Sequence, residues 1–293
     1  MIKLPNVAGT FYPARKEEIL AMMDQFFANV DKEIIPNHLQ SSEKNRQQSS
    51  VLKAIVAPHA GYTYSGQVAA YSYSMLKGHL SLLVTRNSSL PTFVVLAPSH
   101  YEYFEGVSVG LFDTFKTPLG DIDTDMKLGK KLINEYSDYF SFIPATYDQE
   151  HAVEVQLPFL QYIASDGELK IKNGKLKILP LIFGNVNPIE IGKILFELSK
   201  KEEMFFIVSS DLSHFMEYDN AIKVDKETLQ NFLDKDIEII VHGAEACGIH
   251  PWLALTQIAI QSKWTPELLE YKNSGDTAGD KSRVVGYGSV IYH

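Results

Sequence analysis

The sequence predicts an α/β protein in which residues 1–293 form a single domain around a central, largely buried mixed sheet with helices on both faces. Short runs rich in β-branched residues alternate with helical patterns. Several of these runs are apolar throughout, which indicates strands that helices cover on both sides. Of the 293 residues, 45% are hydrophobic and 22% charged, which is the composition of a globular protein with a large core.

The N-terminal third begins with a helix and a polar stretch. Residues 16–30 place Ile19, Met23 and Phe27 on one helical stripe, which predicts a helix packed on the sheet. Residues 36–50 contain almost no core-forming side chains. We expect this stretch to be an exposed polar loop.

Five apolar runs are the predicted strands of the central sheet. They are residues 53–57, 93–97, 177–183, 205–209 and 284–292. The run 106–112 predicts a further strand beside the loop that holds His100. The Asn173-Gly174 pair lies between alternating apolar residues and predicts a hairpin extension over 169–178.

Helix-starting residues separate these strands. Ser65 is a candidate N-cap for a helix that contains Val68 and Leu76. Further helices are expected after Asp123, after Pro188 and at Pro251, where proline suits the first helical position.

The net charge of −9 makes a nucleic-acid partner unfavourable, because a phosphate backbone would be repelled. The N-terminus lacks the apolar core of a signal peptide, and no stretch approaches the roughly 20 apolar residues of a membrane span. We therefore expect a cytoplasmic protein without a membrane partner. The single cysteine, Cys247, is a buried filler, a reactive thiol or a metal ligand.

Three predicted strands are followed by a histidine. His59 comes after the first strand, His100 after the second, and His214 after the run 205–209. One such histidine is usually a loop residue bonded to backbone, but three at the same edge of a sheet indicate a shared site. Imidazole binds iron, copper and zinc, so this site is a candidate transition-metal centre.

The residue pattern alone does not decide which of three residues is the third metal ligand. Cys247 precedes a predicted helix whose N-terminal dipole would favour a thiolate, and Glu154 and Asp211 compete with it. Asp211 lies three residues before His214 and would orient its imidazole if the segment turns helically; otherwise it caps a turn.

Two further groups are candidates for a ligand pocket. His151 and Glu154 are spaced i, i+3. They form either a pair that transfers protons or the start of a helix, where the carboxylate interacts favourably with the helix dipole. Tyr62 and Tyr64 stand close to His59 and would line a pocket for a flat substrate, or they are packing residues.

Seven strings carry a family resemblance from residue 7 to residue 252: VAGTFYP, APHAGYTYSG, APSHY, TPLGD, EHAVEVQLPFL, SSDLSHF and CGIHPW. Their number and order resemble the Memo family, also called the B protein of the AmmeMemoRadiSam system. The resemblance implies a fold like the class III extradiol dioxygenases, which are non-haem iron enzymes. It also implies metal ligands at His59, His100 and Cys247, with Asp211 and His214 nearby.

The cysteine departs from the dioxygenase pattern, in which a glutamate completes the metal site. A thiolate favours softer ions and is itself open to oxidation. We expect a metal-dependent redox protein or dioxygenase-like enzyme for a small planar substrate, with Fe(II) foremost and copper or zinc as alternatives. In it His214 would be the acid/base group and Asp211 its orienting partner.

Two other functions fit the same residues. One is a metal-dependent binding module for tyrosine-containing peptides or for the radical-SAM partner that the system name implies. The other is a zinc-assisted hydrolase.

Overall fold

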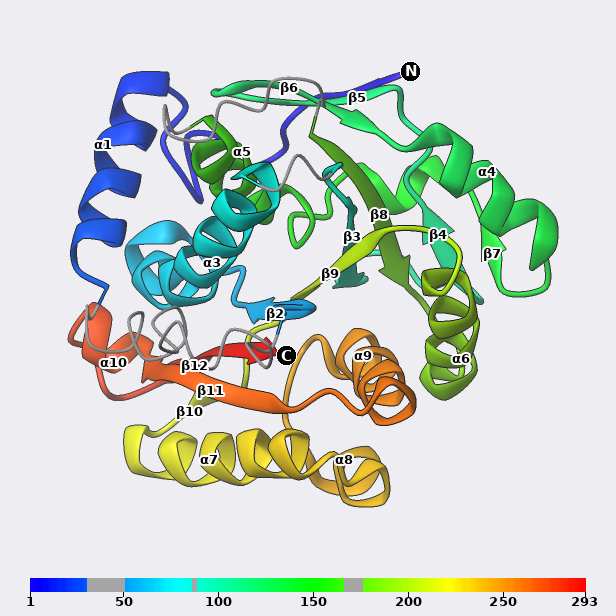
Figure 1. Ribbon diagram of the computed structural model, residues 1–293. Coiled ribbons are helices and arrows are strands. Elements are labelled where there is room, and N and C mark those ends of the chain that lie inside the picture. Colours follow the sequence, from blue (N-terminus) through cyan, green and yellow to red (C-terminus); the bar gives the residue numbers. More distant parts are fainter. Residues whose placement is uncertain (31–50, 86–88, 166–175) are drawn as a thin grey trace, which may run out of the picture.

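The computed structural model describes residues 1–30, 51–85, 89–165 and 176–293. Its strands are β1 (Ile2–Lys3), β2 (Ala54–Ala57), β3 (Thr92–Pro98), β4 (Val107–Val109), β5 (Thr114–Thr117), β6 (Gly120–Thr124), β7 (Phe140–Ser141), β8 (Lys177–Phe183), β9 (Met204–Ser209), β10 (His214–Met216), β11 (Pro266–Asn273) and β12 (Val284–Tyr292). Within the described residues they join into one sheet (Figure 1).

The helices follow the strands along the chain. They are α1 (Lys16–Ala28), α3 (Tyr62–Thr85), α4 (Met126–Glu135), α5 (Leu157–Ser165), α6 (Pro188–Ser199), α7 (Tyr218–Asp234), α8 (Ile237–Gly243), α9 (Ile249–Ser262) and α10 (Ser274–Thr277), with the 3-10 turns η1 (Pro144–Tyr147) and η2 (Glu154–Gln156).

The sheet is mixed, as predicted. Its main strand order is β1-β5-β6-β8-β3-β9-β2-β12-β10, with β11 paired to β12 and β4 paired to β7 and β8. The central strands β8, β3, β9 and β2 run parallel, and β12 runs antiparallel to β2. The carboxyl ends of four neighbouring strands therefore meet at one edge of the sheet.

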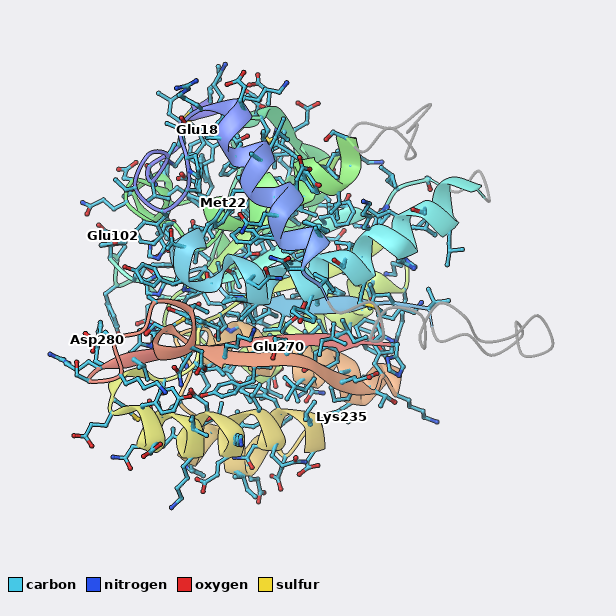
Figure 2. All side chains as sticks on the ribbon, turned by 90° about the vertical axis from the view of Figure 1, so that its left-hand side faces the viewer. Glu18, Met22, Glu102, Lys235, Glu270 and Asp280 are labelled. Atoms are coloured by element: carbon cyan, nitrogen blue, oxygen red, sulfur yellow. The ribbon has the colours of Figure 1, made fainter. Side chains whose placement is uncertain are left out.

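Helices cover both faces because the central strands are apolar on both sides. On β3, Phe93 and Val95 belong to one core with α1, α3 and α5, whereas Val94 and Leu96 belong to a second core with α4, α6, α7, α8 and α9. Figure 2 shows the layers from the side, with β11 and β12 between α3 and α7.

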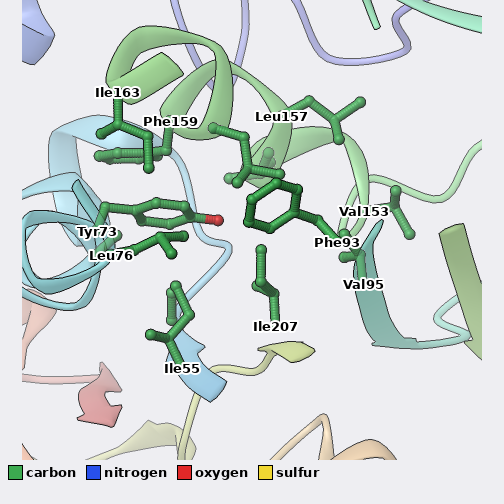
Figure 3. Packing of buried hydrophobic residues seen from close by; sticks show 14 of the residues in the cluster. Ile55, Tyr73, Leu76, Phe93, Val95, Val153, Leu157, Phe159, Ile163 and Ile207 are labelled. Atoms are coloured by element: carbon green, nitrogen blue, oxygen red, sulfur yellow. The ribbon is translucent and has the colours of Figure 1, made fainter. Parts of the chain in front are cut away.

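Figure 3 shows the first of these cores. The rings of Tyr73 and Phe159 stack with centroids 4.8 Å apart, and Phe93 and Ile207 pack against the same cluster from the sheet. Burying such rings is a main source of folding free energy, and it fixes the sheet edge that carries the histidines.

All five main strand predictions are confirmed, and so is the first helix, which runs over Lys16–Ala28. Two helix starts were wrong. Helix α3 begins at Tyr62, and Ser65 lies inside it with its hydroxyl donating to Ala60 O. Helix α9 begins at Ile249, so that Pro251 stands in its first turn.

Two predicted segments fall largely or wholly outside the described residues. They are the loop 36–50 and, within the hairpin 169–178, residues 169–175; Lys177 and Ile178 belong to β8. Among the helices of the described part, none is long and apolar enough to span a bilayer.

Candidate metal centre

Three histidine rings converge at the carboxyl edge of the central strands. His59 follows β2, His100 follows β3, and His151 lies in the segment between η1 and η2. The ring centroids of His59 and His100 are 5.1 Å apart, and those of His100 and His151 are 4.9 Å apart. One ligand atom from each ring lies within 4.8 Å of the other two, so the cluster could hold a metal ion.

His59 is fully enclosed, which favours the neutral imidazole. Its Nδ1 lies 2.9 Å from Ser209 Oγ at the end of β9. Burial, and then the charge of His100, lower the pKa of His59 to about 3. The backbone N–H of His59 donates to Asp211 Oδ1 at 2.8 Å, which fixes the loop that presents the ring.

Glu150 holds His100. The Nδ1 of His100 lies 2.9 Å from Glu150 Oε1, and the backbone N–H of His100 donates to Oε2 at 2.7 Å. Burial opposes the protonated ring, but Glu150 outweighs it and raises the pKa of His100. Burial would likewise raise the pKa of Glu150, yet the bond to His100 prevails and lowers it to about 2. A carboxylate behind an imidazole is the arrangement that commonly orients metal-binding histidines.

His151 supplies a nitrogen without a hydrogen-bond partner among the described residues. Its side chain is 12% exposed, and its buried Nδ1 lies 3.6 Å from Glu150 Oε1, beyond hydrogen-bond distance. Burial, and then the charge of His59, lower the pKa of His151 to about 4. An orphaned neutral nitrogen beside two other imidazoles fits the donor set of a transition metal.

Cys247 adds sulfur to this cluster. Its Sγ lies 3.3 Å from His59 Nε2, and the backbone N–H of Asp211 donates to it at 3.2 Å. Zinc–sulfur and zinc–nitrogen bonds are about 2.3 Å and about 2.0–2.1 Å long, so one ion can contact both atoms.

The sequence predicts that the start of the following helix favours a thiolate at Cys247. Burial, and then the charge of Asp211, outweigh this in the metal-free protein and raise the pKa of the thiol. The residue after it, Gly248, packs against Ser210, whose Oγ accepts from Gly248 N at 3.0 Å.

Asp211 and His214 do not share a helical turn. Leu212 N donates to Gly286 O, and Gly286 N donates to Ser213 O, so this segment pairs with β12 and leads directly into β10. Asp211 instead accepts from the backbone of His59 and Ala60. His214 begins β10 as an exposed residue, close enough for its charge to lower the pKa of His59.

Three residues predicted to line a ligand pocket lie in different surroundings. Tyr62 is buried in the core and donates to Val155 O at 2.7 Å, whereas Tyr64 is 46% exposed. Glu154 accepts hydrogen bonds from Asn6 N, Val7 N and Tyr12 Oη, so it serves the N-terminal segment. The i, i+3 spacing of Glu154 and His151 does not form a pair, because both carboxylate oxygens of Glu154 bind these donors.

The sequence profile for Memo-like proteins matches residues 3–291 of this chain. The chain belongs to the Memo family. A MEMO1 family protein of Methanobrevibacter smithii is 34% identical over 304 residues, with all of both chains covered. MEMO1 family proteins of Nitrosopumilus maritimus and Sulfurisphaera tokodaii are each 31% identical, and they align over the whole of this chain and 100% and 99% of their own lengths. The resemblance seen in the sequence motifs is thereby confirmed.

Three residues of this Memo-family site were not predicted. Glu150 stands directly before His151, and a carboxylate next to a candidate ligand is a signal that could have identified it. Ser209 contacts His59, and Gln156 contacts Ser209, only through the fold, so no local pattern marks them.

A pocket of about 300 Å³ has Cys247 in its lining. It lies at the carboxyl ends of β3 and β8 and at the start of α9. Its lining includes Ser99, Tyr103, Phe104, Phe183, Cys247 and His250. Cys247 therefore touches both the histidine cluster and a pocket with aromatic walls.

Proposed function

We propose that this Memo-family protein binds one transition-metal ion through His59, His100 and Cys247, with His151 beside them, and that it is a metal-dependent redox protein. Fe(II) is the foremost candidate, and copper or zinc are the alternatives. Cys247 and the three histidines are the donor types that these metals accept. We place the protein in the cytoplasm, a reducing compartment in which the free thiol of Cys247 stays reduced.

The observation that carries the proposal is the orientation of the rings. Nδ1 of His59 binds Ser209, and Nδ1 of His100 binds Glu150. Both rings therefore keep Nε2 for an ion, while Cys247 Sγ lies 3.3 Å from His59 Nε2. Rings held in this way on their outer nitrogen are typical of metal ligands.

The pocket beside Cys247 supports a small planar ligand. Tyr103, Phe104 and Phe183 contribute aromatic surface to its wall, and Ser99 contributes a hydroxyl group. When bound, iron or copper supplies one-electron chemistry, whereas zinc supplies Lewis acidity. His214, exposed at the same edge, would hold or move a proton at its ring, while Asp211 would hold the His59 loop.

A binding module without turnover is the second candidate. Exposed aromatic side chains on the segments next to the cluster favour it, since such rings are common in binding surfaces. They are Tyr101 at 54% exposure, Tyr103 at 82% and Phe215 at 63%. A tyrosine-containing peptide, or a radical-SAM enzyme of the same system, is the proposed partner in that case.

Metal content after anaerobic purification tests the proposal. We expect near one metal per chain in the wild type, and loss of most of it in His59→Ala and Cys247→Ser. His242→Ala, in an exposed position on α8, is the matched control and should keep its metal. Unchanged metal content in Cys247→Ser, together with loss of metal in His151→Ala, would show that His151 is the third ligand in place of Cys247. A wild type that takes up no metal would overturn the proposal.

Turnover is tested separately with the iron-loaded protein. Oxygen consumption in the presence of a panel of catechols is expected to rise above that of His214→Ala, which should retain its metal. A flat response across the panel would contradict the dioxygenase-like activity and favour the binding module. Zinc as the only metal found would instead favour hydrolysis.

A further inference from the structure

Ser209 Oγ lies at the centre of a buried hydrogen-bond network behind His59. It is 2.9 Å from His59 Nδ1, 2.6 Å from Ala152 O and 2.8 Å from Gln156 Nε2. Ser209 and Gln156 are both 0% exposed. Because the hydroxyl has one hydrogen and two lone pairs, its three contacts can be assigned completely.

The orientation of the Gln156 side-chain amide follows from its other contacts. Its Oε1 accepts from Tyr73 Oη at 2.8 Å, and its Nε2 lies 3.0 Å from Pro58 O. A carbonyl oxygen only accepts, so the nitrogen must face Pro58, and a flipped amide would place its oxygen against the Pro58 oxygen and lose this bond. Gln156 Nε2 therefore donates to Ser209.

The direction of the Ser209 hydroxyl hydrogen follows next. Ala152 O only accepts, so the single hydroxyl hydrogen points to it. One lone pair of Ser209 takes the Gln156 amide, and only the other lone pair faces His59. The Nδ1 of His59 must then be the donor, which leaves Nε2 unprotonated in a neutral ring.

We propose that Gln156 and Ser209 are positioning residues that hold His59 as its Nδ1–H tautomer and so keep the Nε2 lone pair directed at the metal position. The tautomer itself belongs to the metal-free protein, whereas its role in metal binding rests on the function proposed above. Every partner in the network is uncharged, so His59 is held differently from His100, whose outer nitrogen faces a carboxylate.

The ring nitrogens of His59 test the tautomer directly. Long-range ¹H–¹⁵N spectra of the metal-free, full-length protein distinguish protonated from unprotonated ring nitrogens, and His59→Gln assigns the signals. We expect hydrogen on Nδ1 of His59 in the wild type. Ser209→Ala removes the hydroxyl acceptor and leaves only the Ser209 backbone as an acceptor, so the population should shift towards Nε2–H, the form that free imidazole side chains prefer. Gln156→Leu should shift it the same way by less, because the Ala152 carbonyl still orients the hydroxyl.

Ser72→Ala is the matched control. Ser72 is also a fully buried hydroxyl, bonded to Val56 O and Ser289 Oγ and not to a histidine. It should leave the His59 signals unchanged. Hydrogen on Nε2 in the wild type, or an unchanged Nδ1–H in Ser209→Ala, would overturn the proposal; an unchanged spectrum in Gln156→Leu alone would remove Gln156 from it.

Cobalt(II) titration measures the consequence for metal binding. Ser209→Ala should weaken the affinity by about 10–100-fold, which is typical for losing a group that orients a ligand. Ser209→Thr, which keeps the hydroxyl, should recover part of this loss. Equal affinities of wild type and Ser209→Ala would contradict the role in metal binding. If the wild type binds no cobalt, the proposed function fails while the tautomer is still decided by the spectra.

Discussion

At the scale of single residues, Gly248 determines how closely the Cys247 loop lies against the end of β9. Cys247 N donates to Asp211 O at 3.2 Å, and Gly248 N donates to Ser210 Oγ at 3.0 Å. A Cβ at position 248 would stand 2.5 Å from Ser210 Cβ and 2.9 Å from Ser209 O. Only glycine allows this approach, and the approach brings the sulfur next to His59.

Gly248→Ala is therefore expected to destabilise the protein by about 1–3 kcal/mol, the usual cost of overpacking. Gly243→Ala is the control, because nothing lies within 4 Å of its added Cβ. It should change stability by less than about 0.5 kcal/mol. Urea unfolding of the two variants measures the difference, and equal midpoints would show that the loop adapts.

At the scale of elements, Glu154 ties the N-terminal segment to η2. Its Oε1 accepts from Val7 N at 2.9 Å and Tyr12 Oη at 2.6 Å, and its Oε2 accepts from Asn6 N at 2.5 Å. Three donors from one segment converge on one buried carboxylate. Glu154 thereby joins the start of the chain to the segment that carries His151.

In Glu154→Gln one oxygen becomes an N–H₂ group, which cannot accept from the segment. We expect a loss of about 1–3 kcal/mol for the donors left unpaired, and faster amide exchange at Asn6 and Val7. Metal content should stay at the wild-type level. The exposed pair of Glu190 and Lys193 offers a control, Glu190→Gln, with an effect below about 0.5 kcal/mol. Loss of metal in Glu154→Gln with unchanged stability would instead indicate that Glu154 takes part in metal binding.

Asp225 on α7 makes a second connection between elements. Its Oδ1 accepts from Ser213 N at 2.9 Å, just before β10, and its Oδ2 accepts from Tyr271 Oη on β11 at 2.8 Å. Burial raises the pKa of Asp225 above 3.8, although both hydrogen bonds oppose the shift. The fold therefore binds this proton at higher pH than the unfolded chain does.

The sign of the pH dependence follows from this shift. Between the raised pKa and 3.8, the native state binds the proton more strongly than the unfolded chain does. As the pH falls through this range, protonation of Asp225 therefore increases the free energy of unfolding. We expect the stability of Asp225→Asn relative to wild type to decrease over this range. Asp280→Asn should show the opposite slope, because hydrogen bonds from Ser282 lower the pKa of Asp280. Parallel stability curves for wild type and Asp225→Asn, measured by urea unfolding, would contradict a raised pKa.

At the scale of the whole molecule, the strands were predictable because each central strand is a continuous apolar run. KAIVA, FVVLA and FFIVS can be buried only between two helical layers, and their parallel order brings the following residues to one edge. Helix starts were less predictable. Tyr62 begins α3 without a capping side chain to mark it, and Ser65 offered a stronger local signal than the true start.

The candidate site was only partly predictable, because only some of its residues directly follow a strand. His59 and His100 follow strands, so the sheet alone places them together. His151 lies between two 3-10 turns, and its approach to His100 depends on the carboxylate of Glu150. Ser209 on β9 contacts His59, and Gln156 on η2 contacts Ser209, which no spacing along the chain reveals. Burial also decides the charge of Cys247, and local sequence does not report burial.

We propose that one metal ion is held at the carboxyl edge of the central strands, and an anomalous difference map from crystals loaded with cobalt(II) would locate it. We expect one strong peak per chain between the Nε2 atoms of His59 and His100, within bonding distance of Cys247 Sγ or a His151 nitrogen. A peak elsewhere, or no peak at this edge at saturating cobalt, would contradict it.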